Sequence, residues 1–587
     1  MSNYTFTQLK KNCKKNKDGR IPYKLAVLGD CATQHLAMAI EGYAYEQGYG
    51  LEIFEADYNQ IDIQTMDKHS ELYLFQPQSV LIYMCIQKLY EDFCAVPNSQ
   101  RISFAETIHH KIVNYWKYIS QASKVNILQV TFTYDNDNVF GNYALKTEHS
   151  FSYQLIKLNH LLIESALSFK NVFWVDLGMI QQKLKQTRLY DERMYCVAKM
   201  PFTLEALPEI AKGVLDVIKA VCGQVKKCII LDLDNTLWGG VIGDDGMENI
   251  QIGELGQGHA FTAFQRWLKE LKNRGVLLAV CSKNQENIAK EPFVSHPEMV
   301  LHLNDFAIFV ANWQDKATNI GYIRDKLNIG MDSMVFVDDN SFERNLARIA
   351  FPELTVPELP EDPSQYLGYL ESLNLFETAS FSSEDAARTQ QYRAEAKREI
   401  LKDTLKSFKE YLQELEMTAW AEPFDKMHYS RISQLTQRSN QFNLRTVRYT
   451  EAEIEEIAKD TRFITLYFCL KDKFGDHGLI SVVILKKVSE EELFIHEWLM
   501  SCRVLKRGME EFIINKIMEV AKVRNYVKVT GEYIKTSKNQ MVENLYSDFG
   551  FTSNGNHVYE MLVENYKFME TYIRETEKIT LAENKNM

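Results

Sequence analysis

The sequence lacks the features that mark membrane, secreted and nucleic-acid-binding proteins. No stretch of this 587-residue chain approaches the ~18 uninterrupted apolar residues of a membrane helix. The N-terminal stretch MSNYTFTQLKKNCKKNKDGR has no apolar core, so we expect no secretory signal. The formal net charge of −12 opposes binding to nucleic acid, which usually requires a basic surface. We therefore expect a cytoplasmic protein that has neither a membrane nor nucleic acid as a partner.

Cysteine pairs of the CxxC type are also missing. The 10 cysteines are spread over the whole chain. This spacing argues against a disulfide framework or a zinc site and favours reduced thiols. The remaining composition, 45% hydrophobic and 25% charged residues, is that of an ordinary globular protein, and the length suffices for three or four domains.

Changes of pattern divide the chain into three folded units and a connector. Residues 1–224 alternate short apolar runs, such as KLAVLG, SVLIYMCI and KVNILQV, with helix-like segments, which predicts an α/β unit with a mostly parallel sheet. Residues 225–360 repeat that alternation and end in a proline-bearing segment. Residues 361–416 include the charge and apolar spacing of connecting helices, and residues 417–587 return to strands and helices.

In the second unit, polar residues collect where the predicted strands end. Asp232 and Asp234 follow CIIL, Ser282 follows GVLLAVC, and Asp338 and Asp339 follow SMVFV. In a parallel sheet these ends lie along one edge, and ligands bind in the crevice outside that edge. Four carboxylates gathered there would repel one another. A hard cation such as Mg²⁺, bound through carboxylate oxygens, relieves that repulsion.

A phosphate bound at this edge would give the DxD spacing a chemical meaning. The first carboxylate can attack phosphorus, and the second can protonate the leaving oxygen and later deprotonate the incoming nucleophile. Lys316, just before a further predicted helix, and the Ser282 hydroxyl would hold the phosphoryl oxygens. A DxD pair alone is common in solvated loops and helix caps, but four matched strand ends in this order are much harder to obtain by chance.

The order DLDNT, a strand ending in Ser, a Lys and then VDDN resembles the haloacid dehalogenase (HAD) superfamily of Mg²⁺-dependent phosphoryl-transfer enzymes. The longer strings DLDNTLWGGVIGDDG, AVCSKN, NWQDKATNI and VFVDDNSFER are similar to one branch, the FkbH-like proteins. The resemblance implies that Asp232 is the nucleophile, Asp234 the general acid/base, and Ser282 and Lys316 the phosphate holders. It also implies a Mg²⁺ site made of Asp232, Asp338 and the backbone carbonyl of Asp234.

FkbH-like enzymes take a glyceryl unit from 1,3-bisphosphoglycerate, remove phosphate and deliver glyceryl to the thiol of a phosphopantetheinylated acyl carrier protein. The resemblance implies the same phosphorylated three-carbon substrate and the same partner here. A thioester on the enzyme would need a thiol near the phosphate, and Cys281, next to Ser282, is the candidate. Cys281 fits equally well as a small buried residue, because adjacent strand residues point to opposite faces. A simple phosphatase, or a multidomain binding protein with inactive flanking domains, remains the alternative.

The segment between the DxDxT motif and the next predicted helix is too short for a folded cap domain. Residues 237–260 are rich in glycine, and we expect a brief hairpin or flap with Trp238 near the mouth of the crevice. Such a minimal cap leaves the crevice open, which suits the long pantetheine arm of a carrier protein.

The last unit is similar to GNAT acyl-CoA transferases in its order of strand, RVLKRG loop, helix, strand and N-x6-Y-x3-GF segment. The resemblance implies a phosphate-binding loop at a helix N-terminus that includes Arg503 and Gly508, although Lys506 stands where the family has glycine. Asn539 has the familiar spacing before Tyr546, which is either a general acid or a buried structural residue. Acetyl transfer from CoA is less favoured than binding of the pantetheine arm.

The first unit contains VLGDCATQ, which is similar to the GDS block of SGNH hydrolases with Cys31 in the place of the nucleophile. A working site needs a base, normally in a late DxxH, and no DxxH occurs in residues 1–224. We therefore expect a fold retained for docking rather than an esterase. The expected fold class is α/β with three domains: an SGNH-like three-layer unit, a HAD-like Rossmannoid with a minimal cap, and a GNAT-like unit.

Overall fold

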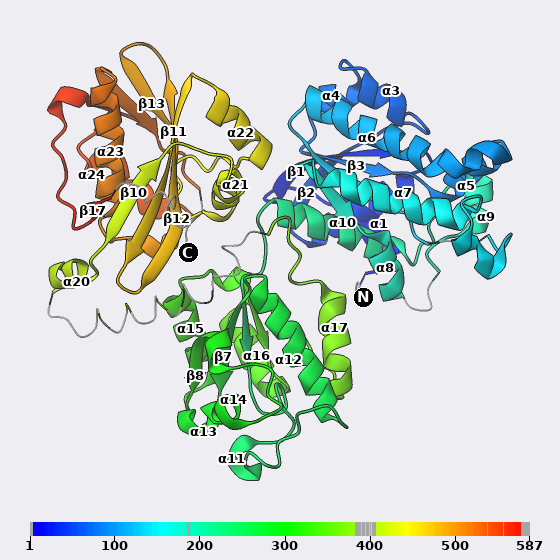
Figure 1. Cartoon of the computed structure of the whole chain (residues 1–587), viewed down its shortest axis with the longest axis horizontal. Coiled ribbons are helices and arrows are strands. Elements are labelled where there is room, and N and C mark those ends of the chain that lie inside the picture. Colours follow the sequence, from blue (N-terminus) through cyan, green and yellow to red (C-terminus); the bar gives the residue numbers. More distant parts are fainter. Residues whose placement is uncertain are drawn as a thin grey trace, which may run out of the picture. The chain divides into compact units, whose positions relative to one another are not determined.

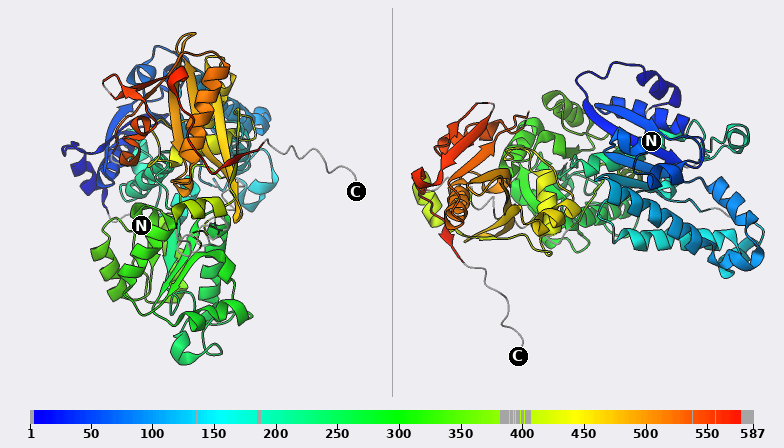
Figure 2. Two further views of the ribbon diagram at one scale, coloured as in Figure 1. Left: turned by 90° about the vertical axis from the view of Figure 1, so that its left-hand side faces the viewer. Right: turned by 90° about the horizontal axis from the view of Figure 1, so that it is seen from above.

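The structure is a computed structural model of the chain. It describes residues 4–134, 137–184, 188–381, 389, 392, 394, 398, 401, 407–536, 538–555 and 557–576. The chain divides into two compact units, Met1–Gln224 with Ser372–Ala379 and Val225–Glu371 with Ser380–Met587 (Figure 1, Figure 2). Among the helices of the described residues, none is long and apolar enough to cross a membrane.

The first unit is built around a five-stranded parallel sheet with the order β2-β1-β3-β4-β5. The chain passes from β1 to β2 on one side and then to β3 on the other, so the topological switch point lies between β1 and β3. The strands are β1 (Ile21–Gly29), β2 (Tyr49–Glu55), β3 (Ser79–Tyr83), β4 (Asn126–Val130) and β5 (Val172–Val175).

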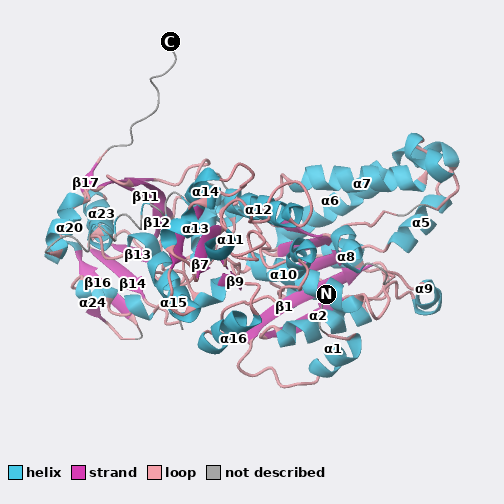
Figure 3. Ribbon diagram, turned by 90° about the horizontal axis from the view of Figure 1, so that it is seen from below, coloured by secondary structure: helices cyan, strands magenta, loops and turns pink. Residues whose placement is uncertain are grey.

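Helices cover both faces of this sheet, which gives three layers (Figure 1, Figure 3). Alternation along the strands explains the two faces, because Leu25 and Val27 point into one apolar cluster and Ala26 and Leu28 into the other. The first face is covered by α1 (Phe6–Asn12), α2 (Gln34–Glu46), α8 (Leu177–Leu184), α9 (Glu192–Ala198) and α10 (Leu207–Val221). The second is covered by α3 (Ile61–Met66), α4 (Glu71–Phe75), α5 (Ile86–Ala95), α6 (Phe104–Ala122) and α7 (Phe151–Ala166).

The second unit begins with a four-stranded parallel sheet of order β8-β7-β6-β9, whose switch point lies between β6 and β9. The strands are continuous apolar runs, as expected for a sheet buried on both faces. They are β6 (Cys228–Leu231), β7 (Leu277–Ser282), β8 (Phe306–Ala311) and β9 (Met334–Val337). The helices are α11 (Ile242–Asp245), α12 (Gly258–Asn273), α13 (Glu286–Lys290), α14 (Pro292–Ser295), α15 (Lys316–Leu327), α16 (Ser341–Ala350) and α17 (Tyr366–Leu373).

Most of the connector helices predicted before residue 407 lie outside the described residues, and α20 (Phe408–Glu414) follows them. The remaining sheet has eight strands in the order β15-β16-β14-β13-β12-β11-β10-β17 and is largely antiparallel, with parallel β13–β14 and β10–β17 pairs. The structure confirms the predicted α/β class, with parallel sheets and several domains. The elements are β10 (Thr418–Glu422), α21 (Tyr429–Arg438), α22 (Glu451–Lys459), β11 (Phe463–Asp472), β12 (Gly475–Lys487), β13 (Glu492–Met500), α23 (Met509–Val523), β14 (Lys528–Glu532), α24 (Leu545–Asp548), β15 (Thr552–Ser553), β16 (Val558–Leu562) and β17 (Arg574–Glu575).

Candidate active site

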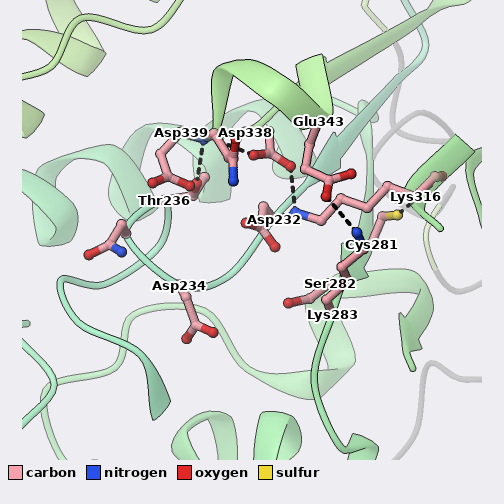
Figure 4. A network of polar contacts seen from close by, with 12 residues as sticks. Asp232, Asp234, Thr236, Cys281, Ser282, Lys283, Lys316, Asp338, Asp339 and Glu343 are labelled. Carbon is pink, nitrogen blue, oxygen red and sulfur yellow. Dashed lines mark hydrogen bonds and ion pairs between the residues drawn. The ribbon is translucent and has the colours of Figure 1, made fainter. Parts of the chain in front are cut away.

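Two carboxylates and one lysine meet at the edge of the four-stranded sheet (Figure 4). Asp232 follows β6 and Asp338 follows the neighbouring β9, while Lys316 begins α15. The Nζ atom of Lys316 lies 2.9 Å from Oδ2 of Asp232 and 2.5 Å from Oδ2 of Asp338. The side chains of Asp232 and Lys316 are 6% and 4% exposed, and Asp338 is fully buried. Buried charges persist when they are paired, and here one cation bridges two carboxylates.

The electrostatics of this cluster follow from its burial. Burial, followed by repulsion from Asp232, raises the pKa of Asp338 to about 7. Burial alone would lower the pKa of Lys316, but Asp232 and Asp338 outweigh that effect and raise it. Burial and Asp232 also raise the pKa of Asp339. The cluster therefore holds more carboxylate charge than the single lysine offsets.

The donor atoms of the cluster fit a hard divalent cation. Carboxylate oxygens of Asp232, Asp338 and Asp339 all lie within 4.8 Å of one another. Oxygen donors of this kind are the ligands that Mg²⁺ takes in proteins. The hydroxyl of Thr236 accepts a hydrogen bond from the backbone N–H of Asp339 at 3.2 Å, which ties the β6 and β9 loops together. The sequence-based prediction of the metal site includes Asp232, Asp234 and Asp338. The structure also places a carboxylate oxygen of Asp339 in this cluster.

The Asp234 side chain lies apart from this cluster and is held by three donors (Figure 4). The indole N–H of Trp238 and the backbone N–H of Ile242 donate to Oδ1, both at 3.0 Å. Nδ2 of Asn284 donates to Oδ2 at 2.8 Å. Burial nevertheless raises the pKa of Asp234. A carboxyl group with a raised pKa and a fixed orientation is suited to proton transfer.

The predicted flap is present as a short bridge between Gly239 and Gln251 with α11 between them. The turn that leads into it needs a left-handed residue, and Asn235, at φ +53°, supplies it. The sequence predicts Trp238 near the mouth of the crevice. In the structure its side chain is instead fully buried and packs against Phe293. In this buried position the indole N–H donates its hydrogen bond to Asp234.

The last two residues of β7 point in opposite directions. Ser282 is almost fully buried, and its Oγ accepts a hydrogen bond from Nδ2 of Asn284 at 3.2 Å. Cys281 belongs to the apolar cluster with Ile230 and the buried residues of α15, and its Sγ lies 3.8 Å from the carbonyl oxygen of Lys316. Burial raises the pKa of the Cys281 thiol well above its usual range. The structure thus places Cys281 in the core and on the face opposite to Ser282.

Several residues that organise the site were not identified from the sequence. Asn284 connects Ser282 to Asp234. Nη1 of Arg344 donates to the carbonyl oxygens of Asp338 and Asp339 at 2.8 and 2.6 Å, which fixes the loop after β9. These residues stand within the AVCSKN and VFVDDNSFER strings, and their residue types alone did not indicate which atoms they would contact.

In the part of the second unit that contains the eight-stranded sheet, a carboxylate of the chain itself occupies the predicted phosphate loop. Gly508, at φ +83°, precedes α23, and Lys506 is also left-handed at φ +59°. The backbone N–H of Lys506 donates to Oε1 of Glu510 at 2.9 Å. A carboxylate therefore lies at the helix N-terminus that a pyrophosphate would need. The side chain of Arg503 lies outside the described part of the chain.

Asn539 and Tyr546 have buried positions in the same part of the second unit. Nδ2 of Asn539 donates to the carbonyl oxygens of Asn443 and Ile534, both at 2.9 Å, so this residue orders two loops. The Tyr546 ring is packed beneath Gly531, where an added Cβ would lie 2.4 Å from the phenol oxygen. Within the described residues, the Tyr546 hydroxyl has no hydrogen-bond partner.

The NQFNLRT stretch, residues 440–446, fills the gap that opens where β13 and β14 separate. The backbone N–H of Leu444 donates to the carbonyl oxygen of Trp498 at 3.2 Å. The backbone N–H of Ile534 donates to the carbonyl oxygen of Leu444 at 2.8 Å. These strand-edge groups are the ones that an extended ligand would use to bind there. This stretch therefore has a structural role as part of the sheet.

Comparisons with known proteins complete the description of the site. The model of the FkbH N-terminal domain matches residues 24–219. One similar solved structure is the N-terminal part of protein BF1531 from Bacteroides fragilis, which contains a phosphatase domain and was solved in complex with Mg. It is 47% identical in sequence to this chain, with a TM-score of 0.62, and the match covers 64% of this chain and 100% of that one. No curated protein matches the sequence.

Two acetyltransferases are similar at a level that carries no inference. The ribosomal-protein-S18-alanine N-acetyltransferase from Escherichia coli is 14% identical, with a TM-score of 0.20, over 26% of this chain and 100% of that one. The spermidine N-acetyltransferase from Vibrio cholerae is 15% identical, with a TM-score of 0.20, over 26% of this chain and 98% of that one.

Proposed function

This chain belongs to the FkbH-like family of HAD-type phosphatases, and we propose that it is a Mg²⁺-dependent phosphoryl-transfer enzyme that loads a glyceryl unit onto an acyl carrier protein. The convergence of Asp232, Asp338 and Asp339 around Lys316 carries the proposal. The Mg in the Bacteroides fragilis structure supports the same cation here. Bound by these carboxylates, Mg²⁺ would supply the positive charge that lets a phosphate approach them.

In this proposal each cleft residue has one task. Asp232 attacks phosphorus and forms an aspartyl phosphate, while Asp234 gives its proton to the leaving oxygen. Water then attacks the aspartyl phosphate, Asp234 takes the proton of that water, and inorganic phosphate leaves with Asp232 restored. Lys316 and Ser282 hold the phosphoryl oxygens during both steps.

The environment of Asp234 favours one of the two phosphates of 1,3-bisphosphoglycerate. An alkoxide leaving group needs a proton, whereas the carboxylate that leaves from an acyl phosphate needs none. Burial raises the pKa of Asp234, and three hydrogen bonds fix the orientation of its carboxyl group, which suits proton transfer to a leaving oxygen. We therefore assign the cleft to the phosphate ester at C3. The acyl phosphate at C1 is left for attack by the carrier thiol on the acyl carbon, which forms the thioester and releases the second phosphate.

The position of Cys281 favours direct transfer to the carrier. Its thiol is buried in the apolar cluster on the face opposite to Ser282, so the proposal does not place glyceryl on this residue. The Glu510 carboxylate at the start of α23 and residues 440–446 occupy positions that CoA would need, which argues against acetyl transfer from CoA. A cytoplasmic location is part of the proposal.

The test is to incubate the purified protein with Mg²⁺, 1,3-bisphosphoglycerate and a phosphopantetheinylated carrier, and to measure the intact masses of carrier and enzyme. Glyceryl on the carrier is the expected result. Free glycerate and phosphate with an unmodified carrier would instead indicate a simple phosphatase. Asp232→Asn should leave a phosphoglyceryl group on the carrier. Cys281→Ala should load the carrier like the wild type, and loss of loading in a folded Cys281→Ala variant would overturn direct transfer.

A further inference from the structure

The parallel sheet of the first unit also presents metal-ligand side chains at its switch point. Cys31 lies beyond the end of β1, and Cys85 lies beyond the end of the neighbouring β3. Oδ of Asp30 and the two Sγ atoms all lie within 4.8 Å of one another. Tetrahedral coordination at a Zn–S distance of about 2.3 Å sets donor atoms roughly 3.7 Å apart, which is within this limit. The three side chains are 6%, 2% and 0% exposed for Asp30, Cys31 and Cys85.

A buried tyrosine hydroxyl points to a ligand at the same place. Tyr83 ends β3 and is 2% exposed, and its hydroxyl has no hydrogen-bond partner in the described part of the chain. Tyr83 belongs to the same buried cluster of side chains as Cys31 and Cys85. A buried polar group of this kind requires an explanation, and a bound ion with its water supplies one.

The surroundings hold the three donors in place. The backbone N–H of Cys85 donates to Oδ1 of Asp30 at 2.8 Å. The Sγ atom of Cys85 caps the ten-residue helix α5 and accepts the backbone N–H of Lys88 at 3.5 Å. A helix N-terminus stabilises a thiolate, which is the form that binds metal. These contacts correspond to the outer hydrogen bonds that orient the ligands of metal sites.

A nucleophilic role for Cys31 fits these observations less well than a metal site. The Cys31 side chain is 2% exposed and lies beside a second thiol and a carboxylate, those of Cys85 and Asp30. A cysteine buried in this way is usually inert as a nucleophile. A soft cation changes the balance, because it displaces the proton when it binds sulfur. The geometry gives such a cation two sulfur donors and one oxygen donor.

A small cavity lies beside the cluster. It is lined by Tyr83 at the end of β3, by Thr33 and His35 at the start of α2, and by Phe202. Three protein ligands leave the fourth position of a tetrahedral site to water or a small ligand, as in catalytic rather than structural zinc sites.

We propose that Asp30, Cys31 and Cys85 bind a soft divalent cation such as Zn²⁺ at the switch point of the first sheet. This site is separate from the carboxylate cluster of the second unit and does not depend on the function proposed for it. It would give the first unit a ligand-binding centre of its own.

Cobalt titration of the full chain tests this proposal. The reduced, chelator-treated protein should develop a near-ultraviolet thiolate-to-cobalt charge-transfer band with one equivalent of Co²⁺, and Zn²⁺ should abolish the band. The band should be lost in Cys31→Ser with Cys85→Ser, and it should persist in the matched control Cys196→Ser, which removes an exposed cysteine. Carboxylate-bound cobalt gives no such band, so the second unit does not interfere.

Two outcomes would overturn the proposal. One is the absence of the band in wild-type protein whose thiols are shown to be reduced. The other is an undiminished band in the double variant. If the double variant does not fold by circular dichroism, Asp30→Asn serves in its place, because it keeps both thiols and the acceptor for the Cys85 N–H. An unchanged Co²⁺ affinity in folded Asp30→Asn would also contradict the three-ligand site.

Discussion

The two parallel sheets of this chain place chemically different groups at the same topological position. In the second unit, Asp232 and Asp338 follow adjacent strands at the switch point. In the first unit, Cys31 and Cys85 follow adjacent strands at the corresponding point. The backbone geometry therefore provides a ligand site in both units, and the side chains decide what binds.

The difference between the two sites is one of ligand hardness and charge. Three carboxylates and Lys316 form a site for a hard cation and a phosphate. Two thiols and the Asp30 carboxylate form a site for a softer cation. Variants that affect one site and leave the other intact can therefore separate the two chemistries.

Asp232→Asn should have the largest effect. Loss of the nucleophile should lower the rate of phosphate release by roughly 10⁴–10⁶-fold, measured with released inorganic phosphate. The cobalt band of the first unit should be unchanged. Asp325→Asn, which alters an exposed carboxylate on α15, is the matched control and should retain the wild-type rate. An Asp232→Asn rate within tenfold of wild type would refute the nucleophile assignment.

Asp338→Asn should act mainly through the cation. The variant loses a carboxylate of the cluster and one partner of Lys316. The Mg²⁺ concentration that gives the half-maximal rate should rise by at least roughly 10–100-fold. A change of that size is the usual cost of losing a residue that only hydrogen-bonds to a metal ligand, and Asp338 is itself a proposed ligand. Initial rates over a Mg²⁺ series measure the shift. The same Mg²⁺ requirement as wild type would mean that the cation is held elsewhere.

Asp30→Asn should act in the other unit. It removes the negative charge of the first site while both thiols remain, so the affinity for Co²⁺ should fall by roughly tenfold. Phosphate release should stay at the wild-type rate in the same preparation. A parallel loss of both properties would show that the two sites are not independent.

Asn284→Ala should produce the smallest change, and its sign is fixed by the hydrogen bond. Nδ2 of Asn284 stabilises the charged form of Asp234, so its removal should raise the pKa of Asp234 further. The limb of the pH–rate profile that reports Asp234 should move to higher pH by about one unit or less. Asn273→Ala, at an exposed position on α12, should leave the profile unchanged. A shift of the limb to lower pH would contradict the role of Asn284.

The sequence predicts much of the second unit, because its signals are local. Apolar runs that end in polar residues reveal the strand ends, and parallel strands bring those ends to one edge, where Asp232, Lys316 and Asp338 are found in contact. The burial of Trp238 and the orientation of Asp234 depend instead on the left-handed turn at Asn235 and on contacts of the flap. These features depend on tertiary contacts, which the spacing of apolar residues in the sequence does not encode.

The site in the first unit could not be predicted from sequence for a different reason. The block around Cys31 is similar to the GDS block of SGNH hydrolases, but Cys85 belongs to no motif. Their proximity follows from the pairing of β1 with β3, and strand order is not encoded in the apolar pattern of either strand. The absence of a CxxC pair excludes only metal sites built from neighbouring cysteines.

The most direct test of the account is to locate the covalent phosphoryl group. The Mg²⁺-activated enzyme is quenched during turnover of a phosphoglyceryl carrier, digested, and examined by mass spectrometry for a phosphorylated peptide. The account predicts a phosphoryl group on Asp232, which is absent from Asp232→Asn. A phosphoryl group on a different residue of the wild-type enzyme would contradict it.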